Sequence, residues 1–190
     1  MPENINLTET LKKLEPNPKY KLFEADNIMN SNLKPINWFV ENVITDGLTL
    51  IVGKPKIGKS WLTLQFAFSL SKGTPCMGFP CRKTRVLYFA LEDSARRIKT
   101  RLTAYSNDPE YSDPSSDLLF SIEPPEAENL EDLIIYLKEL IVAEKINVVI
   151  FDTLAKIFPE NKSGQNVYLS DYKAISKLQR FAVEMNIALL

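Results

Sequence analysis

Residues 47–60 have the sequence GLTLIVGKPKIGKS, and the organisation of the whole chain follows from them. Residues 48–52 form an apolar, β-branched run, which is typical of a strand buried on both faces in a parallel sheet. Residues 53–60 match the spacing G-x-x-x-x-G-K-[ST] at every position. The stretch therefore predicts a strand, then a glycine-rich bend, then the start of a helix.

A bend with this spacing binds the phosphates of a nucleotide through its backbone N–H groups. Gly53 and Gly58 permit unusual dihedral angles and close approach, and the helix that follows directs its positive dipole end at the anion. We expect Lys59 to contact the β- and γ-phosphates of ATP and Ser60 to bind Mg²⁺. A plain strand-to-helix turn is disfavoured because the chain supplies both flanking elements. The expected nucleotide contacts are Gly53, Lys54, Pro55, Lys56, Ile57, Gly58, Lys59, Ser60 and Trp61.

The composition is that of a folded domain without a membrane segment. The chain has 190 residues, of which 45% are apolar and 25% charged, with a net charge of −1. No window approaches the roughly 18 consecutive apolar residues of a membrane-spanning helix. The N-terminus lacks the basic start and apolar stretch of a signal peptide. These features predict a cytoplasmic protein with no membrane partner.

The absence of histidine excludes several mechanisms within this sequence. No Ser-His-Asp triad, Cys-His pair or histidine-ligated metal is available. Cys76 and Cys81 have no further Cys or His to complete a zinc site, so we interpret them as incidental thiols. The net charge argues against wholesale electrostatic binding to nucleic acid. Any such binding must come from local patches or from an assembly.

Apolar runs alternate with helical patterns along the chain. We expect strands at 86–91, 118–122, 147–151 and 186–190, and helices at 61–72, 94–105, 130–143 and 170–185. This alternation predicts an α/β domain with a central parallel sheet, covering residues 36–190. Residues 1–35 are predicted to form an N-terminal arm or small packing element, with Leu7, Leu11 and Leu14 at helical spacing. Trp38 is interpreted as a cover on the sheet edge or, alternatively, as a neighbour of the nucleotide base.

Two acidic residues follow apolar strands, at the edge where open α/β sheets bind ligands. Asp152 ends the run 147–151 and is expected to orient the Mg²⁺ held by Ser60. Glu92 ends the run 86–91 and is expected to activate the water that attacks the γ-phosphate. Asp93 competes with Glu92 for that role, or it is the N-cap of the next helix.

That next helix carries four cations: Arg96, Arg97, Lys99 and Arg101. The simplest interpretation is a solvated face, and the alternative is a contact with nucleic acid or with another subunit.

Three motifs, in their order and spacing, resemble the RecA-like AAA-type P-loop ATPases of the plasmid replicative helicase (RepA-like) group. They are Gly-Lys-Ser-Trp-Leu at 58–62, Val-Leu-Tyr-Phe-Ala-Leu-Glu-Asp at 86–93 and Val-Ile-Phe-Asp-Thr-Leu-Ala-Lys-Ile at 149–157. The resemblance implies a RecA-like core, ring-shaped homo-oligomers with ATP between subunits, and movement along single-stranded DNA. It assigns Lys59 and Ser60 to phosphate and Mg²⁺, Glu92 to the attacking water and Asp152 to the metal.

The resemblance also carries expectations about the C-terminal half. Residues 159–167 correspond to a DNA-facing loop, which offers Lys162 with Asn161, Gln165 and Asn166. The final strand is expected to lie between the phosphate-loop strand and the Asp152 strand. In this family it continues into a His-containing sensor motif, so we expect the RecA-like core to be truncated at the C-terminus.

Three functions remain open at this stage. The first is Mg²⁺-dependent ATP hydrolysis coupled to translocation on single-stranded DNA. The second is a P-loop phosphotransferase, and the third is a nucleotide-gated binding or regulatory module that does not hydrolyse ATP.

Overall fold

The computed structural model describes residues 22–107, 115–157 and 167–190. The chain divides into two compact units, Met1–Ile36 and Asn37–Leu190. The described part of the first unit contains one short helix, α2 (Ala25–Met29). The helix expected around Leu7, Leu11 and Leu14 lies outside the described residues, and so does the expected DNA-facing segment up to residue 166.

The second unit is built on a five-stranded parallel sheet with the strand order β3-β7-β6-β4-β5. The predicted α/β fold class is therefore confirmed. Every strand lies within two residues of its expected start, because each apolar run is bounded by polar or turn-forming residues. The strands are β3 (Gly47–Leu48), β4 (Val86–Ala90), β5 (Leu118–Ser121), β6 (Val148–Asp152) and β7 (Ala188–Leu189).

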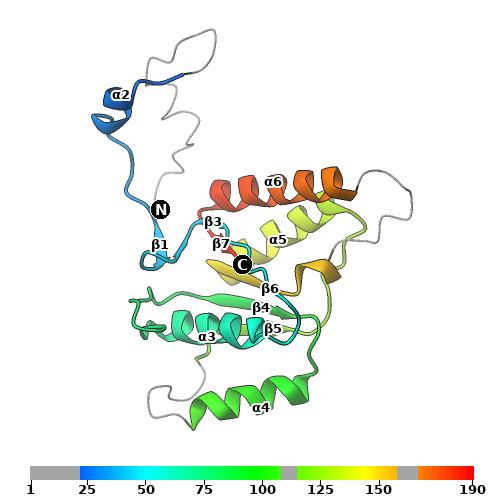
Figure 1. Ribbon diagram of the computed structural model, residues 1–190. Coiled ribbons are helices and arrows are strands. Elements are labelled where there is room, and N and C mark those ends of the chain that lie inside the picture. Colours follow the sequence, from blue (N-terminus) through cyan, green and yellow to red (C-terminus); the bar gives the residue numbers. More distant parts are fainter. Residues whose placement is uncertain (1–21, 108–114, 158–166) are drawn as a thin grey trace. The chain divides into compact units, whose positions relative to one another are not determined.

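The last strand lies where the family resemblance placed it. Ala188 of β7 pairs with Gly47 on one side and with Val148 on the other. The phosphate-loop strand, at the edge of the sheet, and the Asp152 strand, at its middle, are thus separated by β7 alone (Figure 1).

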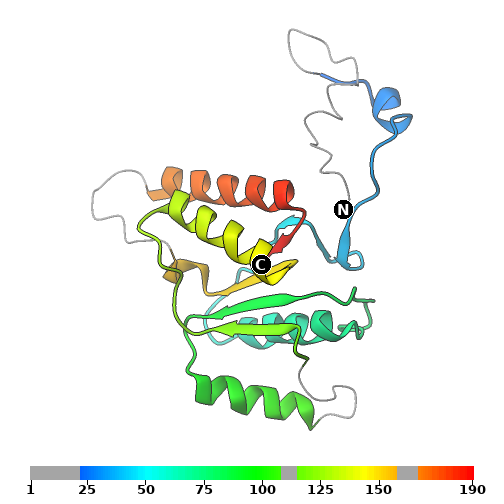
Figure 2. The same cartoon turned by 180° about the vertical axis from the view of Figure 1, so that it is seen from behind.

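Helices cover both faces of the sheet (Figures 1 and 2). One face of the sheet packs against α3, and the other face packs against α5 and α6. Helix α4 lies on the same side of the sheet as α3. The strands alternate between these layers: Tyr88 and Ile150 join the core under α3, whereas Phe89 and Phe151 join the core under α5 and α6. The helices are α3 (Lys59–Lys72), α4 (Ala95–Ser106), α5 (Leu130–Glu144) and α6 (Val167–Met185), with a 3₁₀ turn at Leu154–Lys156.

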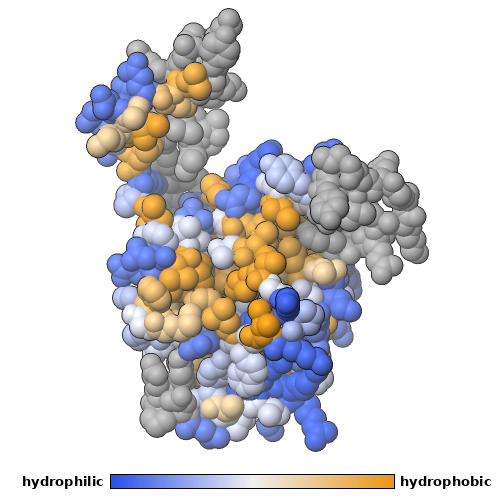
Figure 3. Space-filling model, in the orientation of Figure 1, coloured by the Kyte–Doolittle hydropathy of each residue, from blue (hydrophilic) through white to orange (hydrophobic). Residues whose placement is uncertain are grey.

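The phosphate-loop strand is shorter than its sequence predicts. Regular pairing ends at Leu48, and the last ladder bond runs from the Thr49 N–H to the Leu189 carbonyl. Residues 50–52 are not assigned to a strand, and Val52 is 87% exposed. The expectation of a strand buried on both faces is therefore wrong for its second half. Figure 3, which has the orientation of Figure 1, shows apolar surface gathered where β3 and β7 lie.

A small hairpin precedes β3 and was not foreseen. It joins β1 (Trp38–Val40) and β2 (Ile44–Thr45) in antiparallel pairing. Phe39, Val40 and Ile44 are buried in the core under α3, whereas Trp38 is only partly buried. The hairpin closes the core on the α3 side.

Helix α6 approaches the start of the phosphate-loop strand closely. The Leu48 N–H donates a hydrogen bond to the side-chain oxygen of Gln179 on α6. Gly47 has a φ of 107°, and a Cβ there would lie 2.8 Å from the Gln179 amide nitrogen. The flexible amide could move aside, but the backbone angle strongly favours glycine. Gly47 is therefore required mainly by its conformation.

We predict that Gly47→Ala lowers the free energy of unfolding by about 1–3 kcal/mol, the usual strain of a side chain in this backbone region. Chemical denaturation measures the change. Gln179→Ala in the same chain should recover little of the loss, because it removes the close contact and leaves the strain. Full recovery in the double variant would show instead that crowding by α6 is the cause.

Candidate nucleotide and metal site

The bend between β3 and α3 has the backbone of a concave loop. Gly58 is the N-cap of α3 with a φ of 98°, and Lys56 has a φ of 65°. A Cβ at Gly53 would lie 2.3 Å from Ile57 Cδ1, whereas one at Gly58 would meet nothing within 4 Å. At Gly53 only the end of the flexible Ile57 side chain would have to move, whereas Gly58 turns the chain into the helix beside open space.

The loop presents hydrogen-bond donors without acceptors. Within the described part of the chain, the backbone amides of residues 56–60 donate to no protein acceptor. The Lys59 ammonium donates to the carbonyls of Gly53 and Lys54, at 2.8 and 3.0 Å. Unpaired amides at a helix N-terminus, with an ammonium folded among them, form a site for an anion. A phosphate chain fits this donor set.

Ser60 and Asp152 are in direct contact. The Ser60 hydroxyl donates to Asp152 Oδ1 at 3.1 Å, joining the first turn of α3 to the end of β6. One hydroxyl and one carboxylate are hard oxygen donors that suit Mg²⁺, which takes few protein ligands beside phosphate oxygens and water. The described residues contain no group of three or more His, Cys, Asp or Glu side chains arranged for a metal ion. The pair therefore fits Mg²⁺ better than a metal that needs a protein cage.

Tyr88 holds the other oxygen of the same carboxylate, a contact that sequence reasoning missed. Its hydroxyl donates to Asp152 Oδ2 at 2.9 Å and lies 2.9 Å from Thr63 Oγ1. Since the carboxylate only accepts, Thr63 is the donor to the phenol oxygen. Burial, followed by the charge of Asp152, raises the pKa of Tyr88 well above its ordinary value, so the phenol remains protonated. A tyrosine inside an otherwise apolar strand was the available signal, because a buried hydroxyl needs a partner.

Glu92 lies at the same edge of the sheet as Asp152. Ala90 pairs with Asp152 across β4 and β6, and the Leu91 N–H donates to the Asp152 carbonyl at 2.8 Å. Glu92 follows directly and is exposed. Its backbone carbonyl accepts a hydrogen bond from the Arg97 guanidinium at 2.6 Å. The strand register therefore places both predicted carboxylates at one rim, with Glu92 open to solvent.

Asp93 is committed to an ion-pair cluster. Its side chain is 6% exposed, and it pairs with Arg97 at 3.1 Å and with Arg101. The N-cap of α4 is Ser94, whose hydroxyl accepts the Arg97 N–H, so the N-cap alternative for Asp93 is wrong. Both oxygens of this carboxylate are occupied by guanidinium groups, which leaves little room for a water. The geometry therefore favours Glu92 over Asp93 as the group available to a water.

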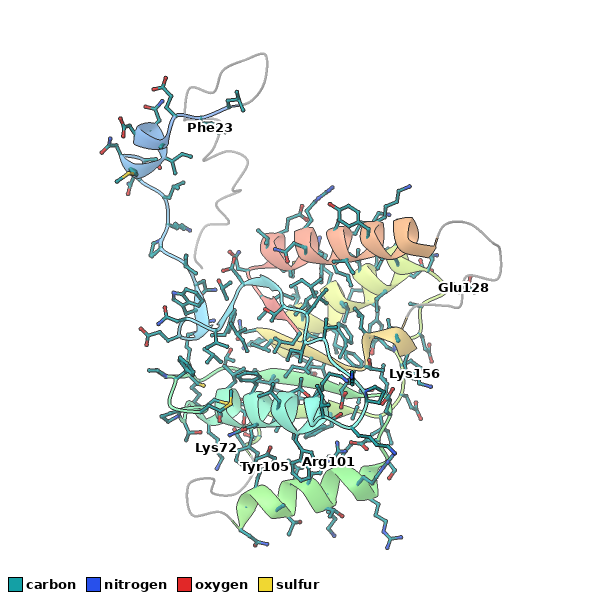
Figure 4. All side chains as sticks on the ribbon, in the orientation of Figure 1. Phe23, Lys72, Arg101, Tyr105, Glu128 and Lys156 are labelled. Carbon is teal, nitrogen blue, oxygen red and sulfur yellow. The ribbon has the colours of Figure 1, made fainter. Side chains whose placement is uncertain are left out.

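The four cations of α4 have different environments. Arg97 and Arg101 both pair with Asp93, but the Arg97 side chain is 63% exposed and only Arg101, at 21%, is largely covered; Arg96 and Lys99 are exposed. Arg101 also lies 5.5 Å from the Trp61 ring, and Figure 4 shows it directed from α4 towards α3. The interpretation as a solvated face therefore holds for Arg96, Arg97 and Lys99 and is wrong for Arg101.

Tyr105 attaches α4 to the helix that begins at the phosphate loop. Its hydroxyl donates to the Trp61 carbonyl at 3.0 Å, and its ring stacks on Phe68 at 5.5 Å (Figure 4). Trp61 itself remains 45% exposed beside the loop. Cys76 and Cys81 form no disulfide within the described residues. No helix in the described ranges has the length and apolar character to cross a membrane.

Comparisons with known proteins identify the family to which the chain belongs. A model of the AAA domain family AAA_25 matches residues 14–190. A comparison with curated proteins finds no match. A similar solved structure is that of a KaiC-like protein from the hyperthermophilic archaeon Pyrococcus horikoshii OT3, with a TM-score of 0.51 and 13% identity. The match covers 80% of this chain and 64% of that one. Because the family model spans nearly the whole sequence, the chain belongs to the AAA_25 family of AAA domains and has a RecA-like P-loop ATPase fold.

Proposed function

We propose that this protein binds Mg²⁺ and ATP at residues 53–61 and hydrolyses the nucleotide, with turnover coupled to movement along single-stranded DNA in replication or repair. The observation that carries the proposal is the 3.1 Å contact between Ser60 and Asp152, next to a loop of unpaired amides. The DNA-coupled part rests on the resemblance to the RepA-like group. The family match supports the nucleotide chemistry.

The loop residues bind the triphosphate in this proposal. The amides of 56–60 donate to phosphate oxygens, and Lys59 exchanges its two carbonyl partners for the β- and γ-phosphates. Ser60 and Asp152 would hold Mg²⁺, which neutralises charge on the phosphates when it is bound. The Ser60 hydroxyl and Asp152 Oδ1 already lie 3.1 Å apart, which supports this assignment.

Glu92 acts on the water. It accepts a proton as the water oxygen attacks the γ-phosphorus, the bond to the β-phosphate oxygen breaks, and ADP leaves. The exposure of Glu92 and its position just after β4, the strand next to β6, support this role. The Arg97 contact fixes the backbone of Glu92 and leaves its carboxylate free to turn towards the nucleotide.

A DNA contact is proposed for the outer side of α4. Arg96 and Lys99 are exposed there, and residues 95–106 contain no acidic side chain. In a chain with a net charge of −1, such a local excess of cations is what electrostatic binding requires. Ring assembly, with ATP between subunits, belongs to the same proposal and rests on the resemblance alone.

We predict that Lys59→Ala weakens ATP binding roughly 10- to 150-fold, the range for losing a hydrogen bond to a charged group. Titration with a fluorescent ATP analogue measures the change. Lys138→Ala removes a cation from the exposed side of α5 and should bind ATP normally. Equal binding by wild type and Lys59→Ala would contradict the phosphate role.

We predict that Glu92→Gln retains ATP binding and lowers phosphate release by roughly 10²- to 10⁴-fold, the usual contribution of a general base. Single-turnover phosphate release measures the chemical step. The matched control is Glu139→Gln on the exposed side of α5, which should turn over normally. A normal rate in Glu92→Gln would assign the water to another residue, and no release by wild type would favour a binding module.

We predict that single-stranded DNA stimulates phosphate release and that Arg96→Ala with Lys99→Ala weakens DNA binding. Loss of two phosphate contacts should reduce the slope of log affinity against log salt by about 1.4. Fluorescence anisotropy across a salt series measures the slope, with Lys138→Ala as control. An unchanged slope would show that α4 does not contact the DNA. In a separate assay, transfer of phosphate to an acceptor in a panel of small molecules would favour a phosphotransferase.

A further inference from the structure

The carboxylate of Asp152 is fixed at both of its oxygens. Oδ1 accepts from Ser60 and Oδ2 accepts from Tyr88, at 3.1 and 2.9 Å. A carboxylate at the end of a strand could otherwise rotate about its side-chain torsions, because the strand stops beside it. Tyr88 therefore determines which oxygen of Asp152 remains directed at Ser60.

Tyr88 can do this because it is itself held by three elements. It lies on β4, paired with Ile150, two residues before Asp152 on β6. Ile150 and Asp152 share a face of β6 because they are two residues apart, and Tyr88 lies opposite Ile150. The side chains of Tyr88 and Asp152 therefore both point to the α3 side of the sheet. Thr63 on α3 contacts the phenol oxygen, and the Phe120 ring of β5 packs at 5.5 Å from the Tyr88 ring. With 2% of its surface exposed, the tyrosine has little freedom to move.

The contact also links the phosphate loop to the metal carboxylate by a second route. Thr63 lies one turn after Ser60 on the same helix, α3. Thr63 donates to the Tyr88 oxygen and Tyr88 donates to Asp152, so α3 reaches this carboxylate through Thr63 as well as through Ser60. A shift of α3 is therefore passed to Asp152 through the phenol as well as directly.

We propose that Tyr88 is a positioning residue for the metal: it orients Asp152 so that one carboxylate oxygen stays paired with Ser60 where Mg²⁺ binds. This rests on the proposed metal role of Ser60 and Asp152. Mg²⁺ tolerates little departure from octahedral geometry, so a rotated carboxylate costs affinity. Residues that orient a metal ligand usually contribute 10- to 100-fold to metal affinity.

Tyr88→Phe removes the hydroxyl and keeps the ring, so it tests orientation with little change in packing. The readout is Mn²⁺ affinity by electron paramagnetic resonance, in the presence of a non-hydrolysable ATP analogue. We expect about 10-fold weaker Mn²⁺ binding, with metal-free nucleotide binding unchanged. Tyr136→Phe, on α5, is the matched control and should bind Mn²⁺ as wild type does. Unchanged Mn²⁺ affinity in Tyr88→Phe would overturn the proposal, even if the variant is less stable.

Two further variants separate the possible failures. Asp152→Asn should weaken Mn²⁺ binding at least as much as Tyr88→Phe. If Asp152→Asn has no effect, the metal role in the proposed function fails; if only Tyr88→Phe has none, the positioning role alone fails. If Tyr88→Phe does not fold, Mn²⁺ affinity is measured in Thr63→Val instead, because this variant removes the hydroxyl that holds the phenol oxygen. We expect a smaller loss of Mn²⁺ affinity there, and an unchanged value overturns the proposal.

Discussion

The hydrogen bond between Ser60 and Asp152 depends on a separation set by the sheet. The two residues come from β6 and from the helix after β3, and β7 lies between those strands. Two strand spacings correspond to about 10 Å, so the strand ends themselves do not touch. The loop and α3 must cross over the sheet to bring Ser60 to Asp152. That crossing leaves a concave space lined with amides, which a direct neighbour arrangement of the two strands would close.

Adjacent carboxylates at this rim have opposite environments. Asp93 is buried and neutralised by Arg97 and Arg101, whereas the neighbouring Glu92 is exposed. The ion pairs would be unfavourable to break, because one buried charge would be left without a partner. They fix the turn after β4, and the Arg97 bond to the Glu92 carbonyl fixes it further. Asp93 therefore stabilises the turn after β4, and the carboxylate of Glu92 remains available at a fixed position beside it.

Much of this arrangement could be predicted from the sequence, and the failures have physical causes. Apolar runs and turn residues predicted β4 to β7 and α3 to α6, because burial of one face is a local property of the pattern. The apolar run 48–52 did not show where the regular strand β3 ends, because strand pairing depends on residues far away in the sequence. The motif spacing singled out Ser60 and Asp152. The Tyr88 contact depends on the β4–β6 register, which no single stretch contains.

The packing of α4 shows how far charge can be interpreted from sequence. Four cations in a helix without acidic residues suggest a strongly basic face, but Asp93 precedes the helix and pairs with two of them. Arg101 is further occupied by the Trp61 ring, next to the phosphate loop. Arg96, Lys99 and most of Arg97 therefore face solvent, while Arg101 is directed at Asp93 and the Trp61 ring. One helix thus has two electrostatic roles: Arg97 and Arg101 hold Asp93 at the rim of the nucleotide site, and the exposed cations remain available to solvent or to an anionic partner.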